Sequence, residues 1–162
     1  MKIYRPNKII SGGETGAQVG ALVGAKRAGI ATSGCASRGY LTESGEYEKI
    51  LRGFGLFSHP STCPKLRSEQ NITYSDATLI VVASMTATKM LVMDAEVAVN
   101  FCKRIGKDYL LVDLDSDTWG EDLLDFIVRV KPQTLNVCGN EESVSPGIAS
   151  KTAKMIQDAF SL

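Results

Sequence analysis

Residues 8–28 read KIISGGETGAQVGALVGAKRA. The stretch begins with a short apolar run at 8–11, passes through a glycine cluster and continues as a helical pattern at 17–28. Small residues along one side of this helix, which would let its backbone lie close to a sheet, are Gly20, Gly24 and Ala28. Gly29 suits a left-handed end of the helix. We therefore predict a strand, a tight turn and a helix, the beginning of a βα unit.

The rest of the chain continues this alternation. Residues 77–83, ATLIVVA, form an apolar and β-branched run typical of a strand that is buried on both faces. Further strands are expected at residues 30–33, 54–58, 109–114 and 135–138. Helices are expected at 46–51 (one turn or two), 64–73, 91–105, 121–130 and 146–160. Such alternation predicts an α/β domain with a mostly parallel sheet.

Two helices carry more detailed expectations. The 91–105 helix should direct one side into the core, and the residues on that side are Val92, Ala95, Val99 and Cys102. The 121–130 helix should be capped by Asp115 or Asp117, because an aspartate oxygen can accept a hydrogen bond from a free amide of the first turn.

The composition limits the classes of partner. The 162 residues suit one domain, 1–162, and the chain carries 18 basic and 18 acidic side chains. This balance gives no overall field that would attract nucleic acid or an acidic membrane surface. Aromatic residues, 7% of the chain, are not interleaved with basic ones as a base-stacking surface requires. We therefore expect neither nucleic acid nor a membrane as a partner.

The first residues and the cysteines indicate a compartment. The segment MKIYRPNKII has a proline and a lysine where a signal peptide needs its apolar stretch, and no apolar run reaches about 18 residues. The four cysteines are far apart and form no CxxC pair; they are Cys35, Cys63, Cys102 and Cys138. Reduced thiols in the cytoplasm are the expectation. His59 is the only histidine, so a structural zinc site is not expected.

In open α/β sheets, ligands bind outside the carboxyl ends of the strands, where the strand order reverses. The loops 12–15, 34–45, 84–90 and 139–146 should lie there. In the first loop, glycines free backbone amides at a helix N-terminus, where a phosphate or carboxylate can bind. The candidate anion site consists of Ser11, Gly12, Gly13, Thr15 and Gly16. The alternative is a tight strand-to-helix turn without a ligand, and Glu14 would repel an anion if it pointed inward.

The remaining loops supply further candidate ligand-binding residues. Arg38, beside Gly39, offers forked donors for an anion, although a loop arginine is also commonly solvated. Thr88 offers a hydroxyl and Lys89 a positive charge. In the last loop, Glu142 and Ser143 can hydrogen-bond a heterocycle, and Glu142 is equally compatible with a surface acid.

Catalytic arrangements have little support in the sequence. A Ser–His–Asp triad would have to use His59, which lies in the least regular part of the chain, and a cysteine nucleophile would need the same base. Carboxylates near the loops leave acid–base chemistry open; they are Glu43, Asp76, Asp94, Glu96 and Glu142. No pair of them is placed closely by the sequence, so binding is favoured over catalysis.

Several motifs, in this order, resemble the molybdenum cofactor carrier family over about residues 8–160. They are SGGETG at 11–16, Gly34 with Arg38-Gly39 and Glu43-Ser44-Gly45, RSEQN at 67–71 leading into SDATLI at 75–80, LNVCG at 135–139, and Glu142-Ser143 with Pro146-Gly147-Ile148. The resemblance implies a Rossmann-like three-layer sandwich related to phosphoribohydrolases of nucleoside monophosphates. It also implies a homo-oligomer that binds molybdenum cofactor (molybdopterin), an anionic pterin with a phosphate, without chemistry.

The chain departs from the family at three places. The Gly-Gly-Thr of the third loop is replaced by Lys89-Met90-Leu91, which removes a backbone cradle for phosphate. Two basic positions of the family are Tyr40 and Glu141 here, a change that weakens binding of a dianion. The related phosphoribohydrolases need a Gly-Gly-x-Gly-Thr loop before a glutamate; Glu96 is near that place, but the loop is not present.

These patterns leave four hypotheses. The first is a non-catalytic carrier of a phosphorylated pterin or nucleotide-like molecule. The second is a nucleotide N-glycosidic hydrolase with Glu96 or Glu142 as the acid or base. The third is a protein that sequesters a nucleotide-derived signalling molecule in the same pocket. The fourth is a chain with a decayed pocket that serves only as an assembly partner.

Overall fold

The computed structural model of the protein describes residues 4–83 and 93–162. Its strands are β1 (Lys8–Ile10), β2 (Ala31–Ala36), β3 (Leu41–Thr42), β4 (Gly45–Glu46), β5 (Leu56–Ser58), β6 (Ala77–Val82), β7 (Asp108–Asp113) and β8 (Thr134–Gly139). Its helices are α1 (Ala17–Arg27), the 3-10 turn η1 (Arg38–Tyr40), α2 (Glu48–Gly53), α3 (Pro64–Tyr74), α5 (Met93–Ile105), α6 (Trp119–Val130) and α7 (Ile148–Phe160). The expected α/β alternation is therefore confirmed.

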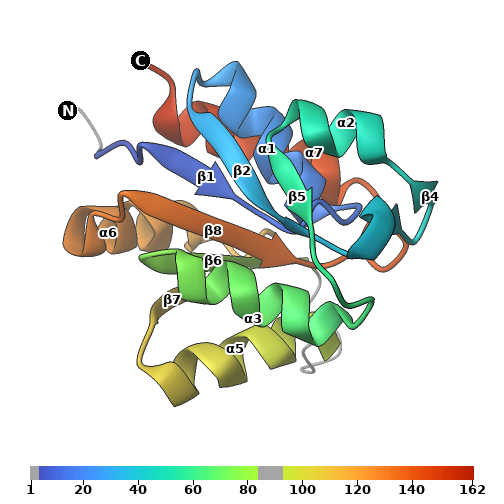
Figure 1. Ribbon diagram of the computed structural model, residues 1–162. Coiled ribbons are helices and arrows are strands. Elements are labelled where there is room, and N and C mark those ends of the chain that lie inside the picture. Colours follow the sequence, from blue (N-terminus) through green and yellow to red (C-terminus); the bar gives the residue numbers. More distant parts are fainter. Residues whose placement is uncertain (1–3, 84–92) are drawn as a thin grey trace.

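Six strands form one sheet in the order β5-β2-β1-β8-β6-β7, and every neighbouring pair is parallel. The chain builds the sheet outward from β1 to β5, crosses to β6 and β7, and then inserts β8 between β1 and β6 (Figure 1). After β8 the chain continues into α7 on one face, whereas after β6 it continues toward α5 on the other. Neighbouring strands whose connections diverge in this way leave a crevice at their carboxyl ends.

Helices cover both faces of the sheet, which confirms the three-layer α/β fold. On one face, α1, α6 and α7 pack on Leu79 and Val81 of β6. On the other face, α3 and α5 pack on Ile80 and Val82 of the same strand. Alternate side chains of a strand point to opposite faces, so the continuous apolar run of β6 fills both cores. The core positions Ala95, Val99 and Cys102 of α5 are buried as expected, and Val92 lies outside the described residues.

The small-residue stripe of α1 faces a helix instead of the sheet. A Cβ at Gly20 would lie 2.3 Å from the carbonyl oxygen of Ala149, and one at Gly24 would lie 2.5 Å from that of Ala153. Both acceptors belong to α7, so the expected close contact with the sheet is wrong for these two glycines. The stripe brings the backbones of α1 and α7 together, and Gly29 ends α1 with the expected positive φ of 74°.

Three local expectations need correction. β2 extends to Ala36, so residues 34–36 belong to a strand and the loop begins at Ser37. Gly34 allows this, since a Cβ there would lie 1.9 Å from the carbonyl oxygen of Ser11. Thr118, and neither of the two expected aspartates, occupies the N-cap of α6. The antiparallel hairpin of β3 and β4 was not predicted, because each strand has only two residues and little burial.

Both ends of the described chain lie at the amino edge of the sheet, away from the candidate loops (Figure 1). Arg5 donates a hydrogen bond to the carbonyl oxygen of Phe160 and so ties the first described segment to the end of α7. Within residues 4–83 and 93–162, no helix is both long enough and apolar enough to cross a membrane.

Candidate functional site

The turn between β1 and α1 satisfies most of its own polar groups. Ser11 is fully buried, and its hydroxyl donates to the carbonyl oxygen of Gln18 at 2.9 Å and accepts from the amide of Gly13 at 3.2 Å. The Glu14 amide donates to Gln18 Oε1 at 3.2 Å, and the Thr15 amide donates to the Glu14 carboxylate at 2.8 Å. The amides of residues 13–15 therefore already have acceptors within the chain. This geometry favours the tight-turn interpretation for that part of the loop.

Two of the three glycines in this turn are required by packing. Gly13 has a φ of 73°, and a Cβ there would lie 2.7 Å from Leu51. Gly16 has a φ of 81°, and a Cβ there would lie 2.3 Å from the carbonyl oxygen of Asn140. A side chain at either position would meet both an unfavourable backbone conformation and a clash. These glycines fit the turn between α2 and the loop after β8.

Gly12 differs because it faces a buried positive charge. A Cβ at Gly12 would lie 2.9 Å from Arg67 Nε and 2.6 Å from Gln18 Oε1. Arg67 lies on α3 and is only 2% exposed. Its Nη1 donates to the Ser37 hydroxyl at 2.9 Å, whereas its Nε is buried and has no hydrogen-bond partner among residues 4–83 and 93–162. Among the ion pairs of the described chain, none includes Arg67.

A buried guanidinium without a carboxylate is costly to keep. Removing an ion from water costs several kcal/mol unless a partner compensates, roughly by the scale known for buried pairs. An anion beside Gly12 would supply that partner and would accept the free Nε–H of Arg67. Sequence reasoning placed Arg67 only within the RSEQN motif and did not assign it to the site. The available signal was its place in that motif, and its burial depends on how α3 packs.

Asn71, one turn after Arg67, fixes α3 against β2. Its Oδ1 accepts from the Cys35 amide at 2.8 Å, and its Nδ2 donates to the Cys35 carbonyl oxygen at 2.9 Å. Residues four apart on a helix share one face, so this clamp also directs Arg67 toward the sheet. Burial raises the pKa of the Cys35 thiol, and the nearby charge of Arg67 opposes this rise only partly. Cys35 is thus held as a thiol and has little nucleophilic character.

The space beside Gly12 is small. A cavity of about 10 Å³ lies at the carboxyl ends of β1 and β8, lined by Gly12, Gln18, Ser68, Asn71, Asn136 and Cys138. Such a volume holds roughly one water molecule. Within the described part of the chain, a phosphate could therefore enter this cavity only if a lining side chain such as that of Gln18 moved.

A second polar cluster joins three of the predicted site residues. The carboxylate of Glu43, from the β3–β4 hairpin, accepts hydrogen bonds from the hydroxyls of Thr15 and Ser143 and from the Ser143 amide, the last at 3.1 Å. The Glu142 amide donates to Thr15 Oγ1 at 3.2 Å. Hydrogen bonds, first from the Ser143 side chain and then from Thr15, lower the pKa of Glu43 to about 2. This cluster therefore has a strong preference for a negative charge.

Glu142 has a structural task that the sequence did not reveal. Its carboxylate accepts hydrogen bonds from the amides of Gly147 at 2.7 Å and Ala149 at 3.0 Å. It thereby satisfies amides at the start of α7, where a negative charge also interacts favourably with the helix dipole. Glu142 is therefore more than a surface acid, because its carboxylate accepts hydrogen bonds from the amides at the start of α7.

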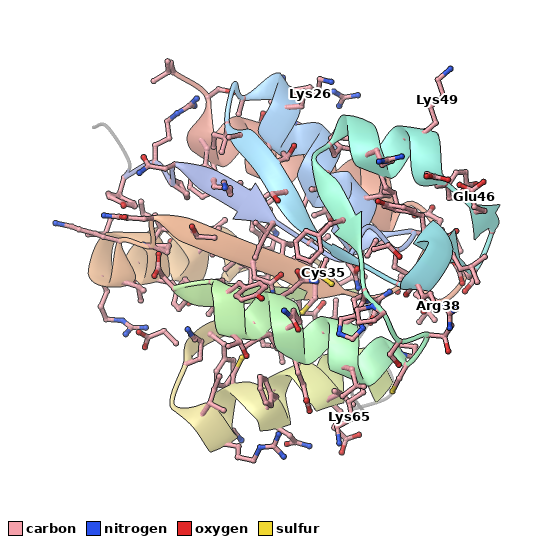
Figure 2. The ribbon with its side chains drawn as sticks, in the orientation of Figure 1. Lys26, Cys35, Arg38, Glu46, Lys49 and Lys65 are labelled. Carbon is pink, nitrogen blue, oxygen red and sulfur yellow. The ribbon has the colours of Figure 1, made fainter. Side chains whose placement is uncertain are left out.

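The other predicted residues lie around the same edge of the sheet or outside the described residues. Arg38 is exposed in η1 at the carboxyl end of β2 (Figure 2), and the Gly39 amide donates to the Ser58 hydroxyl at 2.9 Å. Thr88 and Lys89 fall in the segment 84–92, outside the described residues. Within the described ranges, no group of three or more histidine, cysteine or acidic side chains is arranged to hold a metal ion.

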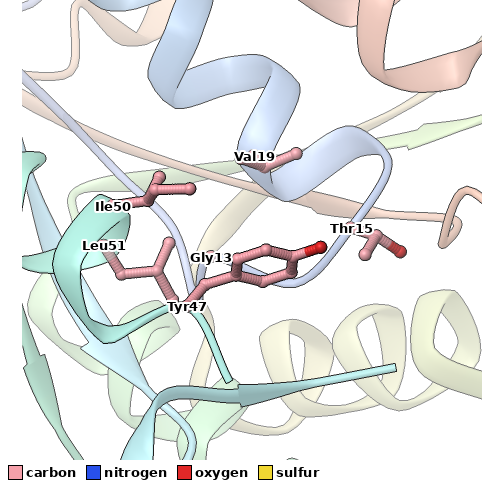
Figure 3. Close-up of a pocket in the computed structure, with 6 residues that line it drawn as sticks. All are labelled: Gly13, Thr15, Val19, Tyr47, Ile50 and Leu51. Carbon is pink, nitrogen blue, oxygen red and sulfur yellow. The ribbon is translucent and has the colours of Figure 1, made fainter. Parts of the chain in front are cut away.

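An apolar cavity lies beside the same turn, between α1 and α2. Its volume is about 240 Å³, and its lining consists of Gly13, Thr15, Val19, Tyr47, Ile50 and Leu51 (Figure 3). The Tyr47 ring extends toward Thr15 with its hydroxyl foremost (Figure 3). Gly12 borders the small cavity of about 10 Å³ at the ends of β1 and β8, and Gly13 borders this apolar one. The turn therefore separates the two cavities.

Comparison with known proteins agrees with this architecture. A family model matches residues 9–160, nearly the whole chain. The chain belongs to the circularly permutated YpsA SLOG family. The crystal structure of a protein named "Putative molybdenum carrier protein", from Syntrophus aciditrophicus SB, is similar to this SLOG protein with a TM-score of 0.86 and 26% sequence identity. The similarity covers 98% of this chain and 97% of the other.

No curated protein matches this SLOG family member. The family expected from the sequence motifs is nevertheless confirmed by the family model and by the similar crystal structure. Both support a ligand-binding α/β protein.

Proposed function

We propose that this protein binds a small phosphorylated anion, molybdenum cofactor or a nucleotide-like molecule, and releases it unchanged. The observation that carries the proposal is Arg67, a buried guanidinium that, within the described chain, has no hydrogen-bond partner for its Nε and takes part in none of the ion pairs. A phosphate oxygen can accept from a guanidinium in a strong, charge-assisted bond. Gly12, which has no side chain, would permit such an oxygen to approach once the Gln18 side chain moves aside.

Two further observations support this ligand class. The similar crystal structure is that of a protein named "Putative molybdenum carrier protein", and the sequence motifs of this chain resemble the molybdenum cofactor carrier family. Arg67 lies near Gly12 and Ser37, which follow β1 and β2 at the carboxyl edge of the sheet, where α/β sheets bind their ligands. Molybdenum cofactor, when bound, would supply a pterin and a phosphate; Arg67 and Gly12 would hold the phosphate, and the exposed Arg38 would add positive charge at the rim.

Tyr40 and Glu141 stand where the resembling family has basic residues, and this difference affects the expected affinity for a phosphate. Tyr40, one of them, is only 9% exposed and packs with Leu22, Leu51 and Leu56 in a small apolar cluster. It therefore stabilises the fold and brings no charge to the ligand. Arg67 is the main cation for the phosphate in this proposal, and the exposed Arg38 is the second.

The hydrolase alternative has less structural support. Glu142 uses its carboxylate to hold the start of α7, and a carboxylate engaged in this way is poorly placed to transfer protons. Glu96, the other candidate acid, is exposed on α5. Binding without conversion is thus the better account of the arrangement.

The test compares titrations of molybdopterin and AMP at low salt with wild type, Arg67→Met and Arg52→Met. Arg52 lies exposed on α2 and gives a control with the same chemical change. We expect binding to wild type and Arg52→Met, and an affinity lower by at least about tenfold for Arg67→Met, because a charge-assisted bond is lost. Met removes the unpaired buried donor, so the variant should remain folded.

Two results would refute the proposal: wild type that binds neither compound, or Arg67→Met that binds as tightly as wild type. Denaturing the purified protein and identifying the released molecule by mass spectrometry separates the alternatives. A recovered intact pterin supports the carrier, and an intact nucleotide of another kind supports sequestration. Free base released from a nucleoside monophosphate would establish the hydrolase.

We further propose a homo-oligomer in the cytoplasm. Large apolar side chains that remain on the surface include Phe57, Leu66 and Tyr74, the last 59% exposed, and a second subunit could cover them. All four cysteines are free thiols, as a reducing compartment requires. Light scattering after size-exclusion chromatography tests the first statement, and imaging of the tagged protein in cells tests the second.

A further inference from the structure

The apolar cavity between α1 and α2 is independent of the Arg67 site. It lies on the other side of the glycine turn, and its walls are formed mainly by Val19, Tyr47, Ile50 and Leu51. At about 240 Å³ it exceeds an apolar cavity of about 150 Å³, which accepts benzene, and falls short of about 300 Å³, where drug-sized sites begin. The cavity therefore has room for one ring and not for a whole nucleotide or pterin phosphate.

The polar member of the cavity, Thr15, belongs to an anion-binding arrangement. Its hydroxyl and two donors of Ser143 converge on the carboxylate of Glu43. These three residues come from the turn after β1, the hairpin and the loop before α7, so the arrangement is assembled by the fold. It holds a carboxylate in a defined position next to an apolar space, which is the pattern of a site for an amphipathic acid.

The charges nearby select the kind of anion. The Glu14 carboxylate accepts from the Glu43 amide at 2.9 Å, and Glu141 also forms a side-chain hydrogen bond with Glu43. The Glu14 carboxylate, which accepts from the amides of Thr15 and Glu43, adds a negative charge beside this position and disfavours a second negative charge on the ligand. A monocarboxylate therefore suits this position better than a dianionic phosphate.

The geometry points to a second binding site, for a small aromatic monocarboxylate. In this proposal the ligand carboxylate replaces Glu43 at the donors of Thr15 and Ser143, and the ring enters the cavity against Tyr47 and Val19. Glu43 acts as an internal competitor, because the hairpin keeps its carboxylate at a high effective concentration near the donors. Removing that carboxylate should therefore open the site.

Benzoate is the probe, with acetate as the acid without a ring and benzyl alcohol as the ring without a charge. Affinity is measured by titration and located by changes in backbone amide NMR signals. We expect benzoate to bind Glu43→Ala at least about tenfold more tightly than wild type, since a charge-assisted competitor for the same donors is lost. The shifted signals should include Thr15, Ser143, Val19 and Tyr47, and both comparison probes should bind more weakly.

Two further variants make the test decisive. Glu43→Gln keeps the hairpin side chain but weakens its acceptor, so its benzoate affinity should lie between those of wild type and Glu43→Ala. If Glu43→Ala does not fold, tighter benzoate binding by Glu43→Gln than by wild type decides the matter. Ile50→Glu, at a residue 52% exposed, places a negative charge at the cavity and should abolish benzoate binding in the Glu43→Ala background.

Equal affinity for acetate and benzoate would overturn the proposal, because the cavity would then contribute nothing. So would unchanged benzoate affinity across the folded Glu43 variants, or binding that survives Ile50→Glu. Arg67→Met distinguishes this site from the proposed phosphate site. It should leave benzoate binding to Glu43→Ala unchanged even though it weakens AMP or molybdopterin binding.

Discussion

Glu43 and Arg67 show how differently the fold treats two charged side chains. Glu43 is exposed and yet receives three hydrogen bonds, while Arg67 is buried and keeps one N–H without a partner. An exposed carboxylate gains its bonds at little desolvation cost, whereas a buried guanidinium is stable only if something compensates its charge. Glu43 thus has its hydrogen-bond donors within the described chain, and Arg67 is the residue on which the proposed phosphate site rests.

The hydrogen bonds of Glu43 predict a specific pH dependence. Its pKa in the folded protein is about 2, below the ordinary value of 4.5, so folding favours the ionised form. This contribution to stability is complete above pH 4.5 and is lost as the pH falls toward 2. Urea unfolding at a series of pH values should therefore show a steeper loss for wild type than for Glu43→Gln, which does not titrate.

Glu48→Gln provides the matched control for this measurement. Glu48 is an exposed acid on α2 whose partner is Arg52, four residues away, and surface pairs of this kind contribute little. Its variant should follow the wild-type curve below pH 4.5. If Glu43→Gln also runs parallel to wild type in that window, the hydrogen bonds to Glu43 do not stabilise the fold.

Sequence reasoning found some residues of the site and missed others for a physical reason. Thr15 and Ser143 were predicted because their hydroxyls follow strands, a property of chain order. Arg67 was not predicted, because an arginine on a helix is usually solvated and only the packing of α3 against Ser37 reveals its burial. The role of Glu142 at α7 depends on a turn geometry that its sequence neighbours do not specify.

At the level of elements, the contact between α1 and α7 makes a stability prediction. Gly20→Ala should gain about 1 kcal/mol of helix propensity but lose more, because the new methyl group would lie 2.3 Å from the Ala149 carbonyl oxygen. Overpacking of this kind typically costs about 1–3 kcal/mol. The net result should be a lower free energy of unfolding, measured as a lower midpoint in urea.

Gly120→Ala is the control for that prediction. Gly120 is exposed in the first turn of α6, and a Cβ there meets nothing within 4 Å. Only the higher helix propensity of alanine then acts, so the free energy of unfolding of this variant should rise by up to about 1 kcal/mol. A Gly20→Ala variant that is stabilised to the same extent would mean that α1 and α7 are not in close contact.

The elements that the sequence predicted well are those with a strong local signal. β6 and α5 carry continuous or periodic apolar residues: β6 ends one residue before the expected position, and α5 ends at the expected residue, Ile105, while residues 91–92 lie outside the described residues. The hairpin has no such signal, and Gly34 resembles a loop residue although it lies in β2. Its place in the strand follows from the close approach of Ser11, a contact between segments that periodicity cannot show.

For the whole molecule, the alternation of strands and helices predicted the layers but left the strand order open. Insertion of β8 between β1 and β6 is a long-range choice, and local patterns carry no information about it. This insertion brings the loop before α7 beside the turn after β1. It therefore creates both the small cavity beside Gly12 and the hydrogen-bonded cluster around Glu43, which lie on opposite sides of that turn.

Hydrogen exchange of the whole protein can separate the two sites. A ligand that binds only the native state stabilises it by about 2.7 kcal/mol at a free concentration 100 times its dissociation constant, and the protection is strongest where it binds. AMP or molybdopterin should slow exchange in β1, β8 and α3, the elements around Arg67. Benzoate added to Glu43→Ala should instead slow exchange in α2 and the segment 41–46. Protection by AMP or molybdopterin confined to the hairpin would contradict the assignment to Arg67, because the phosphate would then lie on the wrong side of the turn.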